Sequence, residues 1–228
     1  MIPVGDVLAA IVTYQPGDEA VALCTALHRQ GCAVLIIDNA STGSETTLAE
    51  LTRCGAEVVS SPANLGIAGA LAQALDRADE RGRRWLLTFD QDSAIEAGFL
   101  DALLGCPAAE QTRTAMVAPR VFDRGTRTFI QGDPDAGAHY PVERVITSGA
   151  LGRVDALQAV GGFRRELFID FVDWDICARL REHDWTIAIA SDAVLNHAVG
   201  RATAHRFLGF LVVTTDHSPE RLYYRYRN

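Results

Sequence analysis

The sequence has 228 residues, of which 48% are hydrophobic, and this suits one large α/β domain or two small ones. Its formal net charge of −8 argues against a nucleic-acid partner held by general electrostatics. All 21 basic residues are arginines, and the lack of lysine excludes a Walker-type phosphate loop and any mechanism that needs a catalytic lysine.

The five cysteines are odd in number and form no Cys-x-x-Cys pair, which argues against a disulfide framework or a cysteine zinc site. They favour a reducing, cytoplasmic location. We expect no secretory signal, because the N-terminus has no basic region followed by a long apolar stretch. The apolar run 207–213 is too short to span a bilayer but leaves room for peripheral contact with a membrane surface.

The first half of the chain alternates predicted strands with predicted helices. Short apolar runs predict buried strands at 7–14, 33–37, 56–60 and 85–89. Helices are expected between them at 19–29, 44–53 and 64–79. This alternation predicts a Rossmann-like α/β fold with a parallel, doubly wound sheet flanked by helices.

The second half is less regular. We expect helices at 99–104, 155–160 and 173–182, strands at 115–118, 145–151 and 186–190, and a long irregular segment over 123–143. No internal repeat or linker is evident. We therefore expect one domain over 1–228 on one mostly parallel sheet, with a nucleotide-binding half (1–93) and an acceptor-binding half (94–228).

The most informative motif is Asp90-Gln91-Asp92, which ends the apolar run 85–89. At the carboxyl edge of a parallel sheet, where open α/β folds bind ligands, alternation would point both carboxylates to the same side. Close carboxylates repel, and a hard divalent ion carrying a substrate diphosphate would relieve that repulsion. The alternative is that Asp90 caps the next helix and Asp92 is a solvated loop residue.

Further polar residues follow the other predicted strands of the first half. Asp38 ends the second strand, and its carboxylate could accept hydrogen bonds from a base imide or a ribose hydroxyl. Asn64 and Gly66 follow the third strand and add an amide and a tight turn beside it. The alternative for Asp38 is helix capping together with Ser41.

Three carboxylates stand among bulky apolar residues in the second half, at Asp170, Asp173 and Asp175. Burying them without a task is costly, and apolar surroundings would raise the pKa of one of them to suit general-base catalysis. A helix N-terminus, where acids stabilise the dipole, is the alternative. We assign Asp175, which has Arg179 four residues later, mainly to structure and Asp173 to chemistry.

His197 follows a predicted strand and could also reach the edge of the sheet. A neutral imidazole is a plausible third protein ligand for a divalent ion. A lone histidine is more often structural, so this assignment depends on the acidic edge already inferred.

These motifs, in this order, resemble the family 2 glycosyltransferases of the GT-A fold over nearly the whole chain. The matching segments are 11–14, 38–41, 64–68, 90–93, 161–163 and 167–179. Within the family, segments 88–93 and 168–173 look most like bacterial rhamnosyltransferases, which use dTDP-L-rhamnose to build O-antigens and other surface polysaccharides. Acceptors in the family range from lipid-linked saccharides to proteins, and for this chain we expect a saccharide or lipid-linked saccharide.

The resemblance implies nucleotide-binding roles in the first half. Thr13, Tyr14 and Asp38 would hold the nucleoside, with Asp38 on the base. Asn64 and Gly66 would border the nucleotide pocket.

The resemblance also implies a metal site and a base. Asp90 would face the ribose or the metal shell, and Asp92, with His197, would bind Mg²⁺ or Mn²⁺ bridging the diphosphate. Asp173 matches the family's catalytic base, and Ser148 falls where acceptor-side loops approach the donor sugar. The implied reaction is inverting, since one base activates an acceptor hydroxyl and no enzyme nucleophile takes part.

The sequence departs from the family at two places. Val172 stands where many members have Glu, so one acidic partner is missing. Relatives usually continue with more helix after the motif that ends at Asn228, so we expect a naturally short member or a shortened chain.

Three alternatives remain open. A UDP-sugar could replace dTDP-rhamnose as the donor. A nucleotidyltransferase would offer a glycine-rich, basic first loop, whereas residues 15–18 are acidic. A non-catalytic nucleotide-sugar-binding module would have lost an acid that this chain keeps.

Overall fold

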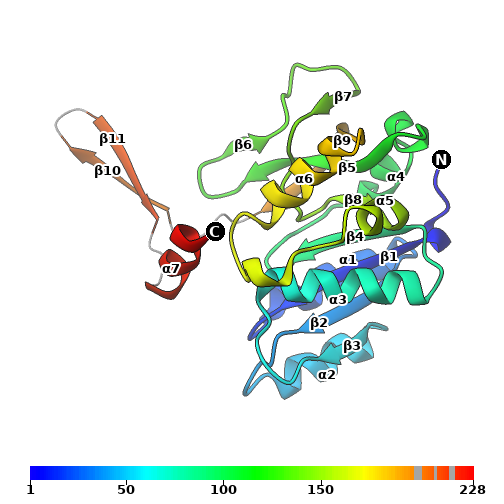
Figure 1. The fold of residues 1–228 in the computed structure, drawn as a ribbon. Helices are drawn as coiled ribbons and strands as arrows, with labels where there is room; N and C mark the ends of the chain where they lie inside the picture. The colour runs from blue at the N-terminus through cyan, green and yellow to red at the C-terminus, as the bar shows by residue number, and fades with distance from the viewer. Residues whose placement is uncertain (198–201, 208–209, 216–218) are drawn as a thin grey trace.

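A mixed nine-stranded sheet runs through the chain, with helices on both of its faces (Figure 1). The strand order is β3-β2-β1-β4-β8-β5-β9-β7, and β6 pairs with β5 outside this path. The structure is a computed structural model that describes residues 1–197, 202–207, 210–215 and 219–228. The predicted membrane contact of 207–213 concerns side chains outside this description.

The first half has the predicted parallel, strand–helix alternation. It comprises η1 (Val4–Asp6), β1 (Val7–Thr13), α1 (Asp18–Arg29), β2 (Ala33–Asp38), α2 (Glu45–Arg53), β3 (Glu57–Ser60), α3 (Gly66–Glu80) and β4 (Trp85–Asp90). β1 pairs in parallel with β2 on one side and with β4 on the other. Every residue of β1 is buried, because helices cover both faces of a parallel sheet.

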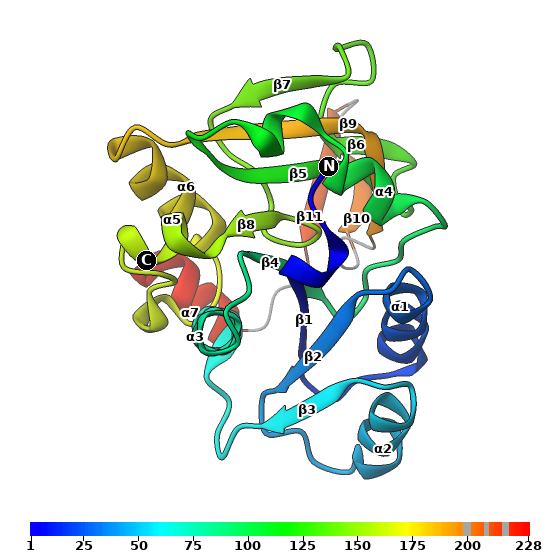
Figure 2. The ribbon, with the colours of Figure 1, turned by 90° about the vertical axis from the view of Figure 1, so that its right-hand side faces the viewer.

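Alternation along β1 divides the core into two layers. Val7, Ala9 and Ile11 pack in a cluster with α1, α2 and α4, whereas Leu8 and Val12 pack in a cluster with α3, α5 and α6. Figure 2 shows α1 and α2 on one side of the sheet and α3, α5 and α6 on the other. The sheet is therefore wound on both faces, as the sequence pattern predicts.

The second half adds antiparallel pairs to this sheet. It comprises α4 (Phe99–Leu104), η2 (Pro107–Glu110), β5 (Thr114–Asp123), β6 (Thr128–Gln131), β7 (His139–Val142), β8 (Leu151–Arg153), α5 (Val154–Ala159), η3 (Arg165–Leu167), α6 (Val172–Glu182) and β9 (Thr186–His197). β10 (Ala202–Phe207) and β11 (Phe210–Thr215) form a separate antiparallel pair before α7 (Pro219–Arg227). β8 lies between β4 and β5 and is antiparallel to both.

Several predicted boundaries in this half are wrong. The strand expected at 145–151 is only Leu151–Arg153, because residues 145–150 form a loop in which the Gly149 N–H donates to the Thr88 carbonyl. The segment expected to be irregular, 123–143, contains β6 and β7. These are short strands with no fully buried residue, so they lack the apolar run that identifies a buried strand.

The strands expected at 115–118 and 186–190 are much longer in the structure. β5 and β9 pair in parallel from Thr114 to Asp123, across register shifts on either side of Pro119. The second part of each strand contains polar residues, so a search for apolar runs ends before the strand does. The extension of β9 carries the chain to His197.

No helix within the described part of the chain is both long and apolar enough to cross a membrane.

A close contact at Gly66 joins the two halves of the chain. Gly66 begins α3 with φ +67°, and the backbone of Phe168 lies so near that a Cβ at residue 66 would overlap the Phe168 carbonyl oxygen. The same first turn of α3 adds a hydrogen bond from the Ala68 N–H to this carbonyl (3.1 Å). Only glycine meets both the left-handed conformation and this close approach.

We expect Gly66→Ala to lower the free energy of unfolding more than Gly43→Ala does. Gly43 has a similar φ of +71° but no atom within 4 Å of its Cβ position. Alanine at this position therefore loses only the free energy of a left-handed backbone conformation, about 1–2 kcal/mol. Alanine in place of Gly66 adds overpacking of about 1–3 kcal/mol. Urea unfolding of both variants measures the difference, and equal losses would contradict the close approach.

Candidate functional site

The carboxyl ends of three neighbouring strands meet at one edge of the sheet. β1 ends at Thr13, whose register partner on β2 is Asp38, and Val12 of β1 is paired with Asp90 of β4. Parallel strands that end in step bring their following residues together. The predicted acidic edge is therefore present.

Asp38 is buried and organises the turn that follows β2. Its carboxylate accepts hydrogen bonds from Thr13 Oγ1 (3.0 Å), the Ser41 N–H (3.0 Å) and Ser41 Oγ (2.5 Å). The contact with Ser41 is present, but it braces a turn and caps no helix, since α2 begins only at Glu45. A carboxylate has about four acceptor positions, so one remains for a donor on a ligand.

Gln91 joins the ends of β1 and β4. Its Oε1 accepts from the Tyr14 N–H (2.8 Å), and its Nε2 donates to the Tyr14 carbonyl (3.2 Å). The Tyr14 side chain remains 49% exposed beside the edge. Gln91 lies between two acids in the sequence, but a two-point contact with the backbone 77 residues away leaves no local signal of this role.

Asn64 and Gly66 form one turn after β3. Asn64 Oδ1 accepts from the Gly66 N–H (2.8 Å), and Asn39 Nδ2 donates to the Gly66 carbonyl (3.2 Å). Asn39 Oδ1 also accepts from the Leu65 N–H (3.3 Å). The buried Asn39 therefore fixes this turn against the end of β2, a role that sequence reasoning missed.

Asp90, Asp92 and His197 converge at the acidic edge. One ligand atom from each lies within 4.8 Å of the others, and His197 Nδ1 is 3.7 Å from Asp92 Oδ1. β9 brings His197 across the fold, and an isolated bridge between Ala94 and Asn196 joins its end to the loop after β4. Two carboxylates and an imidazole are donors that fit Mn²⁺ or Mg²⁺.

Two serines orient this group. Ser93 Oγ lies 3.3 Å from His197 Nδ1 and 2.8 Å from Ser148 Oγ. Ser148 Oγ accepts from the Asp90 N–H (3.0 Å), so the loop after β7 is tied to the end of β4. Such outer contacts hold ligand side chains in place. Ser148 was expected near the donor sugar, whereas no local pattern in the sequence indicated this role for Ser93.

Negative charge accumulates here. Burial is the main cause that raises the pKa of Asp90 to about 6; the charges of Asp92 and Asp173 also raise it, and those of His197 and Arg221 lower it. Asp173 thus lies close enough to affect Asp90 electrostatically. A cation between these carboxylates would stabilise their ionised forms.

Asp173 stands in the first turn of α6. Its Oδ1 accepts from the Trp174 N–H (2.9 Å). Burial is the main cause that raises the pKa of Asp173; the hydrogen bond from Trp174 and the charge of Arg144 lower it, and the charge of Asp170 raises it. A carboxylate with a raised pKa is suited to accepting a proton.

Asp175 has the structural role expected of it. It pairs with Arg179 (2.5 Å) and with Arg164 (3.0 Å). The buried Arg179 also donates to the carbonyls of Val160 and Gly162, which ties α6 to the end of α5.

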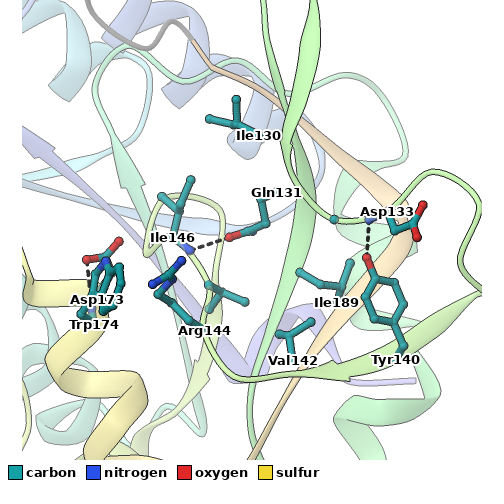
Figure 3. Close-up of a pocket in the computed structure, with 12 residues that line it drawn as sticks. Ile130, Gln131, Asp133, Tyr140, Val142, Arg144, Ile146, Asp173, Trp174 and Ile189 are labelled. Carbon is teal, nitrogen blue, oxygen red and sulfur yellow. Dashed lines mark hydrogen bonds between the residues drawn. The ribbon is translucent and has the colours of Figure 1, made fainter. Parts of the chain in front are cut away.

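A pocket of about 530 Å³ opens beside Asp173 (Figure 3). Arg144 lies over the Trp174 ring at 3.6 Å from its centroid, and both line the pocket. The opposite wall carries Asp133 and Tyr140, whose hydroxyl accepts from the Asp133 N–H. β6 and β7 supply much of this wall, so the segment expected to be irregular is an ordered wall of the pocket.

The model of Glycosyl transferase family 2 matches residues 9–172. The chain belongs to this family. It is 28% identical over 248 residues to the dTDP-rhamnosyl transferase RfbF of Shigella flexneri, covering 98% of this chain and 78% of that protein. It is also 28% identical to the uncharacterized protein Rv1525 of Mycobacterium tuberculosis, over 91% of this chain and 79% of that protein.

Solved glycosyltransferase structures share the fold. GalNAc-T7 with UDP, GalNAc and Mn²⁺ superposes with a TM-score of 0.69 at 12% identity over 89% of this chain. TarS 1-349 of S. aureus superposes with a TM-score of 0.64 at 16% identity over 84% of this chain. The chain spans 44% and 60% of these two proteins. The predicted GT-A fold is confirmed.

We expect Asp173→Asn to stabilise the protein at pH 7. The pKa of Asp173 is about 4 in the unfolded chain and higher in the folded chain. Between these two pKa values the folded chain binds more protons than the unfolded chain, so the free energy of unfolding of the wild type falls as the pH rises through this range. The asparagine variant does not titrate, so it should not lose stability in this range, and at pH 4 it should be no more stable than the wild type. Urea unfolding at pH 7 and at pH 4 measures the difference in free energy of unfolding.

Asp175→Asn is the matched control on the same helix. It removes the partner of Arg179 and Arg164 and should lower stability at pH 7 by about 1–3 kcal/mol. Destabilisation at pH 7 by both variants would contradict the burial cost assigned to Asp173.

Proposed function

We propose that this family member is a metal-dependent, inverting glycosyltransferase that moves a sugar from a nucleotide diphosphate to an acceptor hydroxyl. One observation carries the proposal: the cluster of Asp90, Asp92 and His197 lies within electrostatic reach of the raised-pKa carboxylate of Asp173, beside a pocket. A metal-diphosphate site and a proton acceptor are the two parts that such a transfer needs.

The nucleotide-binding half, 1–93, would hold the donor. Tyr14 offers an exposed ring for a base, and the remaining acceptor position of Asp38 suits a base N–H. Thr13 orients that carboxylate through its hydroxyl. Asn64 and Gly66 form the turn that would border the nucleotide.

Asp90, Asp92 and His197 would hold Mn²⁺ or Mg²⁺. When bound, such an ion would supply positive charge to offset that of the diphosphate. Ser93 and Ser148 would keep the ligands oriented.

The acceptor-binding half, 94–228, would hold the acceptor in the pocket beside Asp173. Its volume lies within the range of about 300–1,000 Å³ typical of small-molecule sites, and Trp174 and Tyr140 offer aromatic faces beside polar groups. Asp173 would take the proton of the acceptor hydroxyl as its oxygen bonds to the anomeric carbon. The bond from that carbon to the diphosphate breaks, the leaving group keeps the electron pair, and the anomeric centre inverts.

L-rhamnose from dTDP-rhamnose is the donor sugar we favour, because the match to RfbF over 98% of this chain supports it. The UDP named with GalNAc-T7 and TarS makes a UDP-sugar the second candidate. We propose a saccharide or lipid-linked saccharide acceptor in surface-polysaccharide synthesis, for example of O-antigen. Buried free thiols fit a reducing compartment, and we extend the proposal to a cytoplasmic location with peripheral membrane contact.

We expect Asp173→Asn to reduce transfer from dTDP-rhamnose by about 10²–10⁴-fold, since a general base contributes that much. Affinity for dTDP should stay near wild type, because Asp173 touches the acceptor. The control is Asp184→Asn, an exposed acid just beyond the other end of α6, which should transfer at the wild-type rate. Near-wild-type transfer by Asp173→Asn would refute the base assignment.

Calorimetric titration of dTDP and of UDP, each with and without Mn²⁺, tests the donor and the metal. We expect Mn²⁺ to tighten dTDP binding more than UDP binding, and Asp92→Asn to lose that metal-dependent gain. Asp101→Asn, an exposed acid on α4, is the control and should keep it. A preference for UDP would reject the rhamnosyl donor, and metal-independent binding would reject the metal site.

A further inference from the structure

The segment between η3 and α6 has an unfavourable backbone. Phe168, Asp170 and Phe171 have φ values of 61°, 61° and 60°. Left-handed conformations are costly for residues with a side chain and persist only where the surroundings impose them. Since this segment leads directly into the first turn of α6, whatever restrains it also sets where Asp173 lies.

One restraint comes from α3. The Phe168 carbonyl accepts from the Ala68 N–H at 3.1 Å, and Gly66 packs against the Phe168 backbone. This contact holds one end of the segment but leaves the carbonyls of residues 167, 169 and 170 to other partners.

The other restraint comes from the last residue of the sequence. Asn228 Nδ2 lies 2.8 Å from the Leu167 carbonyl, 3.0 Å from that of Ile169 and 3.4 Å from that of Asp170. The two N–H groups of one side-chain amide are thus shared among three carbonyls of the turn. Arg227 adds a hydrogen bond from its guanidinium to the Glu166 carbonyl.

Side chains of α7 reinforce these backbone contacts. The Tyr224 ring stacks on the Phe168 ring, with centroids 4.4 Å apart and planes 16° apart. Arg221 donates to both carboxylate oxygens of Asp170, at 3.3 and 3.0 Å. The helix therefore holds the segment through its carbonyls, a ring and a carboxylate. Figure 1 shows α7 on the side of the molecule where the η3–α6 segment lies.

We propose that α7 acts as a clasp that holds residues 166–171 in place, with Phe168, Asp170 and Phe171 in their left-handed conformation, with Asn228 as the positioning residue, and so places Asp173 for catalysis. The segment is connected to Asp173 by a hydrogen bond at the start of α6, from the Asp175 N–H to the Phe171 carbonyl (2.9 Å). Asp173 lies between these two residues in the sequence. The catalytic part of this inference rests on the proposed role of Asp173 as the base. The structural part does not.

A purely stabilising helix would behave differently. It would lower the unfolding temperature when disrupted, with no selective effect on the 167–175 backbone or on turnover. A clasp should instead affect the amides of that segment and kcat, while the KM for the donor stays unchanged, because the donor contacts lie on other elements.

The experiment uses the full chain with Asn228→Ala and Asn228→Asp. Alanine removes the donor, and aspartate keeps the shape but turns a carboxylate toward three carbonyls, so it should be the worse of the two. Arg225→Ala is the control on the same helix, since within the described residues the exposed Arg225 has no hydrogen bond or ion pair from its side chain.

Hydrogen exchange of the Ala68 and Asp175 amides reports the backbone directly. We expect these two amides to exchange about tenfold faster in Asn228→Ala than in the wild type, which corresponds to the loss of a typical hydrogen bond. Their exchange in Arg225→Ala should equal that of the wild type. We expect kcat to fall by about tenfold or more with the donor KM within twofold, since a displaced catalytic group loses rate steeply.

Unchanged exchange in both Asn228 variants would overturn the clasp. Faster exchange with unchanged kcat would overturn its link to Asp173. If the wild-type protein transfers no sugar at all, the proposed function fails, while the exchange measurement still decides whether α7 holds the segment.

Discussion

Repulsion among carboxylates is the constraint that the site has to meet. Asp90, Asp92 and Asp173 share one edge of the sheet, and burial together with the other two charges raises the pKa of Asp90 to about 6. Two of the three lie at the end of β4 and in the loop that follows it, and the third arrives on α6 from the other half of the chain. The surrounding structure supplies the compensating groups: His197, Arg144 and Arg221 each lower the pKa of one of these acids.

The fold brings these groups together by ending its strands at one place. β1, β2 and β4 end in step, and the serines and His197 of the second half are then joined to that edge. In the candidate metal site, the two carboxylates come from residues 1–93 and the imidazole comes from residues 94–228. Neither half contains all of these side chains, so the junction between the halves matters as much as each half.

That junction depends on specific backbone contacts. Gly66 and Ala68 contact Phe168 across the two halves, while Asn39 holds the Gly66 turn within the first half and Asn228 holds the turn of residues 167–170 within the second. These contacts link the proposed nucleotide pocket to the start of α6. They also explain how a costly left-handed backbone can persist beside Asp173.

The sequence by itself determined the parallel half of the fold, the acidic edge and the structural role of Asp175. Buried strands show as apolar runs, strand ends are followed by functional residues, and an Asp–Arg pair at i,i+4 is local, so each signal lies within a few residues. The family resemblance rested on the same local motifs. The functional roles of all the site residues stay predictions: Thr13, Tyr14, Asp38, Asn64, Gly66, Asp90, Asp92, Asp173 and His197.

The tertiary structure decided what depends on distant partners. Gln91 acts on Tyr14, Ser93 and Ser148 act on His197 and Asp90, and Asn228 acts on residues about 60 positions away. The edge strands β6 and β7 and the full length of β9 likewise follow from pairing with β5 and with each other, not from apolar periodicity. Hydrogen bonds between residues far apart in the chain leave no periodic pattern, so only the folded chain reveals them.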